Sequence, residues 1–261
     1  MAELQARYGE VSVGREGHVA MLEWSRPPNN FITVQVLSDL ADALDAVDRV
    51  RELRASVLVT GGKVFSAGAD LVSGGAGSAE PSATNPLYDQ VVRLVGTAKP
   101  LVAAVQGAAV GAGFGLALVA DFRVAAPEAR FAANFVKLGF HPGFGITHLL
   151  PRLVGPQKAA LMTLTGRRVR AEEALAWGLV DELAPLPELR AAALRLAAEI
   201  AENAPLAVQS TRATLRADLA AAVRAQTDHE HAEQTRLRAT ADFAEGVRAV
   251  NERRPGNFIG A

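Results

Sequence analysis

Residues 101–120, LVAAVQGAAVGAGFGLALVA, form a stretch of the chain without a single charged side chain. A stretch of this length and polarity either crosses a bilayer or lies in the core of a folded domain. Gln106 and several glycines interrupt it, and it has few of the large apolar residues that favour membrane insertion. Residues 101–105 are all apolar, which is typical of a strand covered on both faces of a sheet. We therefore expect a buried strand followed by a glycine-rich turn, and no membrane span.

The sequence before and after this stretch alternates between strand and helix patterns. Residues 11–24 alternate apolar and polar side chains around a turn, which predicts a β-hairpin. Apolar residues at helical spacing after Thr33, a candidate N-cap, predict a helix, and a second helix is expected over residues 86–95, opened by a proline. Short strands are expected at residues 56–60 and 122–126. This alternation indicates an α/β fold.

The composition changes after Pro151, where helical patterns dominate. Helices are expected at residues 157–164, 171–177 and 188–202, and in a long charged stretch at 206–253. The alanine-rich faces of these helices need a surface to pack on, either the α/β core or another subunit. We therefore expect a core domain at residues 1–200 and a C-terminal helical region at 201–261 that takes part in oligomerisation.

Charge and cysteine content exclude several classes of function. The chain has 27 Lys and Arg against 28 Asp and Glu, so nothing favours nucleic acid or an anionic membrane as a partner. The absence of cysteine excludes disulfides and thiolate metal sites, and no zinc, phosphate-loop, dinucleotide or nucleophile-elbow motif is found, so no metal is expected. Residues 1–14 mix both charges without an apolar run, which favours a cytoplasmic protein.

Two segments of the sequence combine a strand, a glycine turn and the start of a helix. They are VLVTGGKVFSAGADL, which ends at Leu71, and the stretch that begins at Leu101. The first turn of a helix leaves backbone N–H groups without acceptors, and the helix dipole favours negative charge there. Two such donors directed at one oxygen form an oxyanion hole. Each segment taken singly is also typical of a tight turn in a packed core.

Together with three later segments, these two resemble the enoyl-CoA hydratase/isomerase (crotonase) family. The matching blocks lie, in order, at residues 65–71, 99–126, 131–155, 165–183 and 245–260. The resemblance implies a spiral of ββα-type turns with a C-terminal helical region, assembled as a homotrimer or as a hexamer made of two trimers. It also implies an acyl-CoA thioester as the small-molecule ligand, with coenzyme A arriving as part of the substrate and no separate cofactor.

The resemblance assigns roles to particular residues of this sequence. It implies that the backbone N–H groups of Ala69 and Ala112 hold the thioester oxygen, although relatives usually have glycine at the second position. Alanine serves there provided that the backbone does not require a positive φ. Contacts with coenzyme A are implied for Arg26, Ala67, Asp70, Leu71 and Arg253. For Arg253, a solvated helix terminus is an equally good interpretation.

The chain departs from the family at the acid and base positions. Hydratases of this family use two glutamates to position and deprotonate water, and those positions are Gly115 and Phe135 here. A third position, which carries a single acid in several isomerases, is Gly143. General acid–base catalysis contributes about a hundred- to ten-thousand-fold to a rate. We therefore expect either a weak or atypical hydratase/isomerase, or an acyl-CoA binder without catalysis.

His141, two residues before the empty third position, is the candidate for a relocated acid or base, because histidine transfers protons near neutral pH. The alternative is a loop histidine whose ring only bonds the backbone. The remaining candidates are expected to be structural: Tyr88 and Asp89 in packing or at the surface, His148 as a satisfied core residue, and His229 and His231 in solvent.

Overall fold

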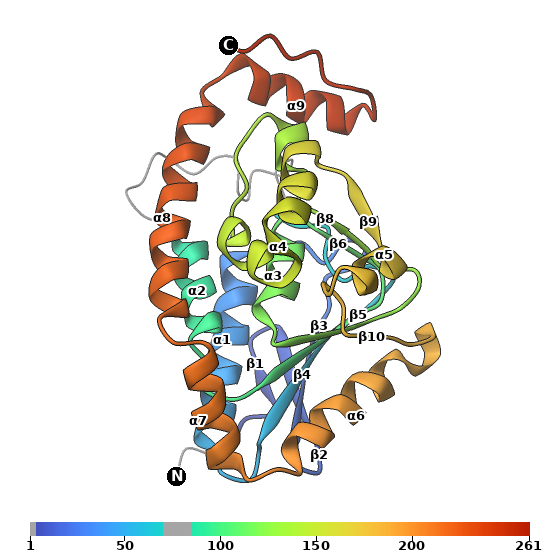
Figure 1. The fold of residues 1–261 in the computed structure, drawn as a ribbon, viewed down its shortest axis with the longest axis vertical. Helices are drawn as coiled ribbons and strands as arrows, with labels where there is room; N and C mark the ends of the chain where they lie inside the picture. Colours follow the sequence, from blue (N-terminus) through green and yellow to red (C-terminus); the bar gives the residue numbers. More distant parts are fainter. Residues whose placement is uncertain (1–3, 70–84) are drawn as a thin grey trace.

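A computed structural model of the 261-residue chain describes residues 4–69 and 85–261. Asp70 and Leu71, two of the residues expected to contact coenzyme A, lie outside this range. Within it, the main sheet has the strand order β1-β2-β3-β4-β5-β7-β10 (Figure 1). The strands are β1 Arg7–Tyr8, β2 Val11–Glu16, β3 Val19–Trp24, β4 Ala55–Thr60, β5 Leu101–Val105, β7 Phe122–Ala125 and β10 Glu182–Leu183. The strands from β3 to β10 pair in parallel, and β1, β2 and β3 pair antiparallel.

The N-terminal elements follow the sequence pattern closely. The expected hairpin is β2 and β3, with Ser12 opposite Glu23. Helix α1, Val34–Arg49, begins after Thr33, whose hydroxyl accepts a hydrogen bond from the N–H of Val36 at 3.2 Å. Helix α2, Pro86–Val95, has its proline in the first turn, where the missing N–H costs no helical hydrogen bond. The α/β fold expected from the sequence is confirmed.

Strand β5 is covered on both faces, as its composition predicts. Leu101, Ala103 and Val105 belong to one apolar cluster, which includes α1 and α2. Val102 and Ala104 alternate with them and belong to a second cluster, formed with helix α6, Leu189–Ala201. The two clusters lie on opposite faces of the sheet because neighbouring strand residues point to opposite sides.

The glycine-rich part of the uncharged stretch forms strand β6, Ala108–Val110, and helix α3, Ala112–Val119, whose residues are all buried. Strand β6 belongs to a small second sheet with β8, Arg130–Ala132, and β9, Arg168–Arg170. A side chain on Gly107 would collide with the carbonyl oxygen of Lys63, so this turn requires glycine. None of the helices in the described residues is both long and apolar enough to cross a bilayer.

The later helices differ in extent from the expectation. Helix α4, Ile146–Thr165, starts before Pro151 and not near residue 157, and it bends at Gly155, where φ is 75°. Helix α5, Ala171–Ala176, and α6 lie where helices were expected. The long charged stretch is not one helix. It divides into α7 Pro205–Leu215, α8 Leu219–Arg238 and α9 Ala241–Asn251.

Local breaks separate these C-terminal helices. Asp218 adopts a left-handed conformation before α8, and the hydroxyl of Thr240 caps α9 by accepting from the N–H of Phe243. Figure 1 shows α7 and α8 running along one side of the molecule and α9 across one end. Helix α8 packs against α2 and α4, so the C-terminal helices contact elements of the preceding residues. The boundary at residue 200 remains a prediction.

Candidate active site

The two glycine-rich segments lie side by side. The N–H of Ser66 donates to the carbonyl of Ala108, and the N–H of Val110 donates to the carbonyl of Ser66, both at 3.0 Å. This parallel pairing sets Ser66 opposite Ala109. Two residues beyond this bridge, Gly68 lies beside the start of α3. A Cβ on Gly68 would lie 3.5 Å from the nitrogen of Ala112, which shows how close the two backbones are.

The backbone amides of Ala69 and Ala112 are the two donors that the resemblance assigns to the thioester oxygen. Ala112 is the first residue of α3, after Gly111 with a φ of 55°, and a first-turn amide has no acceptor within its helix. Within residues 4–69 and 85–261, neither the amide of Ala69 nor that of Ala112 has a hydrogen-bond acceptor. The positive φ falls on Gly111, and neither alanine has one, so alanine is compatible with the backbone at both positions.

The described residues with a predicted coenzyme A contact lie in different settings. Arg26 is exposed, with its Nε 3.2 Å from a carboxylate oxygen of Glu10. Ala67 is half-buried, and its N–H donates to the carbonyl of Asn29 at 2.9 Å. Arg253 is exposed just after α9, with a φ of 55°. An exposed Arg253 is compatible with both of its interpretations.

Asn30 organises this part of the site and was not identified from the sequence. Its side-chain oxygen accepts from the N–H of Arg26 at 2.7 Å, and its Nδ2 donates to the carbonyls of Gly61 at 2.7 Å and Val64 at 2.9 Å. Asn30 is buried and has a φ of 49°. Asparagine tolerates this left-handed conformation better than most residues, so the pair of asparagines that follows Pro27 and Pro28 was the available sequence signal.

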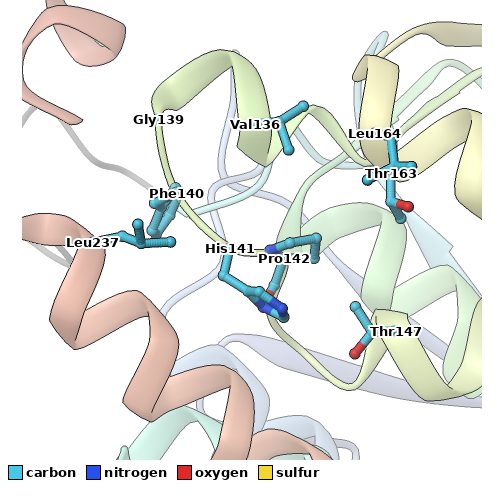
Figure 2. Close-up of a pocket in the computed structure, with 9 residues that line it drawn as sticks. All are labelled: Val136, Gly139, Phe140, His141, Pro142, Thr147, Thr163, Leu164 and Leu237. Carbon is cyan, nitrogen blue, oxygen red and sulfur yellow. The ribbon is translucent and has the colours of Figure 1, made fainter. Parts of the chain in front are cut away.

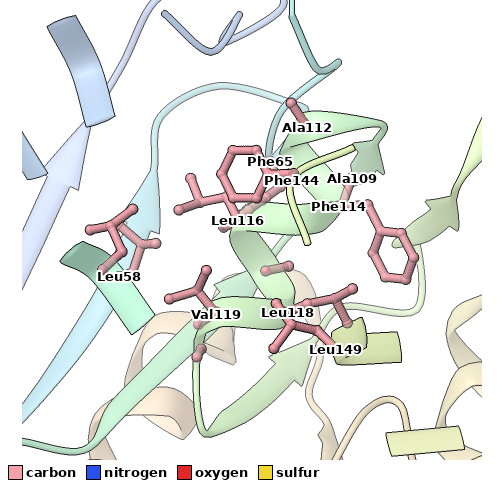
Figure 3. Close-up of a cluster of buried hydrophobic side chains, with 14 of the residues drawn as sticks. Leu58, Phe65, Ala109, Ala112, Phe114, Leu116, Leu118, Val119, Phe144 and Leu149 are labelled. Atoms are coloured by element: carbon pink, nitrogen blue, oxygen red, sulfur yellow. The ribbon is translucent and has the colours of Figure 1, made fainter. Parts of the chain in front are cut away.

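Phe144 fills the space beside Gly115, the first of the three positions at which the resemblance implies an acid. A Cβ on Gly115 would lie between 2.5 and 2.7 Å from three atoms of the Phe144 side chain. Phe144 is buried and lies with Phe65 and Leu116 in the cluster drawn in Figure 3. Any side chain at position 115 therefore requires Phe144 to move.

The other two positions at which the resemblance implies an acid, Phe135 and Gly143, also lie among neutral side chains. Phe135, at the second position, is buried in the short 3₁₀ helix η1, Asn134–Leu138, with its ring 5.6 Å from that of Phe140. At the third position, a Cβ on Gly143 would collide with the hydroxyl of Tyr88 and with the side-chain amide of Gln234. None of these groups is a carboxylate.

Tyr88 is a buried packing residue and Asp89 a surface residue, as expected. The Tyr88 hydroxyl donates to Gln234 at 2.9 Å, and the Gln234 amide donates to the carbonyl of His141 at 2.9 Å. Burial, followed by the charge of Glu230, raises the pKa of Tyr88 above its ordinary value, so the phenol stays protonated. Asp89 is partly exposed and forms an ion pair with Arg224.

His141 lines a cavity of about 400 Å³ (Figure 2). The other lining residues are Val136, Gly139, Phe140, Pro142, Thr147, Thr163, Leu164 and Leu237. The Nδ1 of His141 lies 2.7 Å from the carbonyl oxygen of Pro142, and its ring is 5.8 Å from that of His229. Ala69 and Ala112 are brought together by the fold, but neither is among the residues that line this cavity.

Two of the remaining histidines differ from the expectation. His148 is half-buried, but its Nε2 is buried without a hydrogen-bond partner, so it is not a satisfied core residue. Burial, followed by the charge of Arg152, lowers the pKa of His148 and so favours the neutral ring. His231 is half-buried, and its ring lies edge-on to that of Tyr88, so it is not in solvent. The reason is that α8 packs against α2, which carries Tyr88. His229 is exposed, as expected.

Glu230 is the titratable residue that the sequence reasoning missed. It is fully buried on α8, where one carboxylate oxygen accepts from the N–H of Gly145 at 2.7 Å. The other accepts from the N–H and the hydroxyl of Thr147, at 3.2 and 2.5 Å. Burial raises the pKa of Glu230 to about 7, against the opposing effect of these hydrogen bonds. The signal was its place on the buried stripe of α8, which runs through Val223, Thr227, Glu230 and Gln234.

No group of three or more metal-ligating side chains occurs in the part of the chain that the structure covers. The site is therefore built from backbone amides, apolar rings and neutral hydrogen-bonding groups. Such a site can stabilise negative charge on an oxygen, and it offers no ionised carboxylate at the three positions described above.

The chain is similar in sequence to proteins of a known family over most of its length. Residues 14–261 match the family described as "Enoyl-CoA hydratase/isomerase". A probable enoyl-CoA hydratase of Mycobacterium tuberculosis is 39% identical over 235 residues, which cover 89% of this chain and 91% of the relative. A 2,3-dehydroadipyl-CoA hydratase of Escherichia coli is 35% identical, over 96% of this chain and 99% of the relative.

Solved structures give the same result for the fold. An enoyl-CoA hydratase/isomerase from Pseudoalteromonas atlantica superimposes with a TM-score of 0.86 and 31% identity, over 96% of this chain and all of that one. A carnitinyl-CoA hydratase from Mycobacterium avium gives a TM-score of 0.86 and 32% identity, over 97% and 99% of the two chains. Since sequence and fold agree over nearly the whole length, this chain belongs to the enoyl-CoA hydratase/isomerase family.

Proposed function

We propose that the protein binds an acyl-CoA thioester with the carbonyl oxygen between the backbone amides of Ala69 and Ala112. The observation that carries this proposal is the close approach of the two glycine-rich segments, where a Cβ on Gly68 would lie 3.5 Å from the nitrogen of Ala112. The relatives named as hydratases of CoA thioesters give the class of ligand. Coenzyme A contacts are proposed for Arg26, Ala67, Asp70, Leu71 and Arg253.

The proposed reaction is weak or atypical hydration or isomerisation. An oxyanion hole stabilises the enolate-like thioester anion, and a single donor of such a hole is worth about a hundred- to a thousand-fold in rate. Proton transfer is the missing contribution, since Gly115, Phe135 and Gly143 carry no acid. His141 is the proposed relocated acid or base, and its ring faces the cavity of Figure 2.

An acyl-CoA binder without catalysis is the second candidate. The observation that favours it is the Phe144 ring, which occupies the space of a side chain at position 115. In either case the proposed assembly is a homotrimer or hexamer in the cytoplasm, with residues 201–261 contributing to the subunit contacts and completing the coenzyme A site. Light scattering coupled to size exclusion gives the number of subunits directly.

The sharpest test of the oxyanion hole is Ala112→Pro, which removes the amide hydrogen and leaves helix α3 intact. Ala112 is the first residue of α3, a position that tolerates proline, and the preceding Gly111 is free to adopt the conformation required. We expect butyryl-CoA to bind about tenfold more weakly by calorimetry, because the thioester oxygen loses one donor.

Ala241→Pro is the matched control, because Ala241 is the exposed first residue of α9 and follows the extended Thr240. It should bind butyryl-CoA like the wild type. Equal affinity of the Ala112→Pro variant and the wild type would contradict the proposed hole.

A second measurement separates the two candidates. Hydration of a short trans-2-enoyl-CoA is assayed with the wild type and with His141→Ala. Turnover that is lost in His141→Ala supports the relocated acid or base, and binding without turnover supports the silent binder. Turnover at ordinary enzyme rates, on the order of 10 per second, with His141→Ala unaffected would contradict both.

A further inference from the structure

Glu230 is a buried carboxylate for which the proposed thioester chemistry has no use. It is fully inaccessible to solvent, and no cation within the described residues forms an ion pair with it. All of its hydrogen bonds go to the start of α4, at Gly145 and Thr147. Burying a carboxyl group without an ion-pair partner is costly even when it is hydrogen-bonded, and these hydrogen bonds fix the position of the start of α4.

Glu230 holds one end of the segment that carries Phe144. The N–H of Gly145, the next residue, donates to the carboxylate. The other end is held by Gln234, which donates to the carbonyl of His141. Phe144 lies between these two anchors with a φ of 66°, a conformation that a bulky residue keeps only where its surroundings enforce it.

Phe144 in turn contacts the helix that begins the thioester site. Its ring packs where a side chain of Gly115 would be, and the N–H of Gly115 donates to the carbonyl of Gly111 at 3.0 Å. Gly115 and Ala112 belong to the same first turn of α3. A displacement of the Phe144 ring therefore acts directly on the turn that presents the Ala112 amide.

We propose that Glu230 is a positioning residue that holds the Phe144 ring against Gly115 and thereby keeps the first turn of α3 in the geometry that binds the thioester. The proposal rests on the proposed function, because it assigns Glu230 to the same site. Among the described residues the hydrogen bonds of Glu230 go to Gly145 and Thr147 and not to the two alanines, so Glu230 acts through the segment 144–147.

The charge state of Glu230 sets how firmly this segment is held. From α2 it faces the Tyr88 phenol, which stays protonated, and from α4 it faces Thr147, which also accepts from Gln226 of α8. No charged neighbour contributes to its pKa, and burial is the largest cause of the shift from 4.5 to about 7. When the segment 144–147 is closed, Glu230 is buried and binds a proton near neutral pH. When the segment opens, Glu230 becomes hydrated and releases that proton.

Because the closed and open states bind different numbers of protons, the opening of the segment depends on pH. Between the ordinary pKa and about 7, the closed state binds more protons, so rising pH favours opening until Glu230 is ionised in both states. The opening equilibrium of the segment should therefore increase about tenfold from pH 6 to pH 8.

Amide hydrogen exchange at Gly145 and Thr147, corrected for intrinsic rates, measures this opening without any ligand. The wild type should show the increase, and Glu230→Gln should show a flat profile, because glutamine does not titrate. The glutamine amide also places a donor against the donors of Gly145 and Thr147, so butyryl-CoA should bind several-fold more weakly to this variant. Asp228→Asn, an exposed carboxylate on the same helix, is the control and should match the wild type.

The outcomes separate this proposal from the proposed function. Wild-type protein that fails to bind butyryl-CoA would overturn the proposed function and this proposal together. Wild-type binding with unchanged affinity and an unchanged exchange profile in Glu230→Gln would overturn this proposal alone. If Glu230→Gln does not fold, Thr147→Val removes a donor to the carboxylate and should move the exchange midpoint to higher pH; an unmoved midpoint counts against the proposal.

Discussion

At the scale of single residues, the space beside Gly115 is filled by a side chain from a distant part of the sequence. Gly115 leaves space within α3, and Phe144 occupies it from a different segment. The ring presents apolar surface beside the first turn of α3. A residue at position 115 and a residue at position 144 are therefore coupled, and neither can be changed without regard to the other.

This coupling is measurable in a double-mutant cycle. Gly115→Glu should destabilise the protein by more than about 3 kcal/mol, because the new side chain collides with a buried ring and its charge has no partner. Phe144→Ala alone should cost about 3 to 5 kcal/mol through the cavity it leaves. In the double variant the glutamate occupies that space, so the cost in urea denaturation should be below the sum of the two. Simple additivity would show that the two sites are independent.

Glu230 makes the stability of the whole protein depend on pH in a defined direction. Its pKa is raised from 4.5 to about 7 by burial, so its contribution to stability is present below about pH 4.5 and is lost as the pH rises through 7. The free energy of unfolding of Glu230→Gln relative to wild type should therefore increase between pH 5 and pH 8, by at most on the order of 3 kcal/mol. A difference that stays constant with pH would contradict a raised pKa.

At the scale of secondary structure, helix ends and glycine turns place the site. The first turn of α3 supplies Ala112, and the start of α4 supplies the amides that bind Glu230. Helix α1 begins at a conventional N-cap, Thr33, whose own hydroxyl also lies 3.4 Å from a guanidinium nitrogen of Arg26. The capping residue thus links the helix to the proposed coenzyme A contact.

Thr33→Ala should cost about 1 kcal/mol in urea denaturation, because the N–H of Val36 loses its acceptor. Thr33→Ser retains a hydroxyl and serves as the control, with stability close to that of the wild type. A loss of the same size in both variants would show that the methyl group, and not the cap, is responsible.

At the scale of the whole molecule, the C-terminal helices anchor the site from outside. Glu230 and Gln234 on α8 bind backbone groups of the segment between η1 and α4. Helix α9 is also tied to the end of the chain, since a carboxylate oxygen of Glu245 accepts from the N–H of Asn257 at 2.9 Å. Helix α8 therefore not only packs against the core but also fixes the segment between η1 and α4 through hydrogen bonds.

A chain that ends at residue 204 tests this arrangement. It lacks α7, α8 and α9, so the buried faces of α2 and α4 become exposed and the segment 141–147 loses the hydrogen bonds from Gln234 and Glu230. We expect the midpoint of thermal unfolding to fall by well over 10 °C, with binding of a hydrophobic dye. An unchanged, cooperative transition would show that residues 1–204 fold independently.

Local patterns in the sequence were enough to predict much of the fold. Thr33 and Pro86 mark the starts of α1 and α2, and the apolar run 101–105 forms a strand buried on both faces. These features depend on caps, proline geometry and periodicity, which act over a few residues. The two segments that bring Ala69 and Ala112 together were also recognisable, because each carries its own glycine turn.

Only the tertiary structure decided what surrounds those amides. The ring of Phe144 reaches Gly115, and the carboxylate of Glu230 reaches Gly145 across 85 residues of sequence. The division of the charged stretch 206–253 into three helices likewise depends on the surfaces that α8 and α9 cover. Burial and long-range contact are properties of the packed chain, and no local pattern encodes which distant side chain will fill a given space.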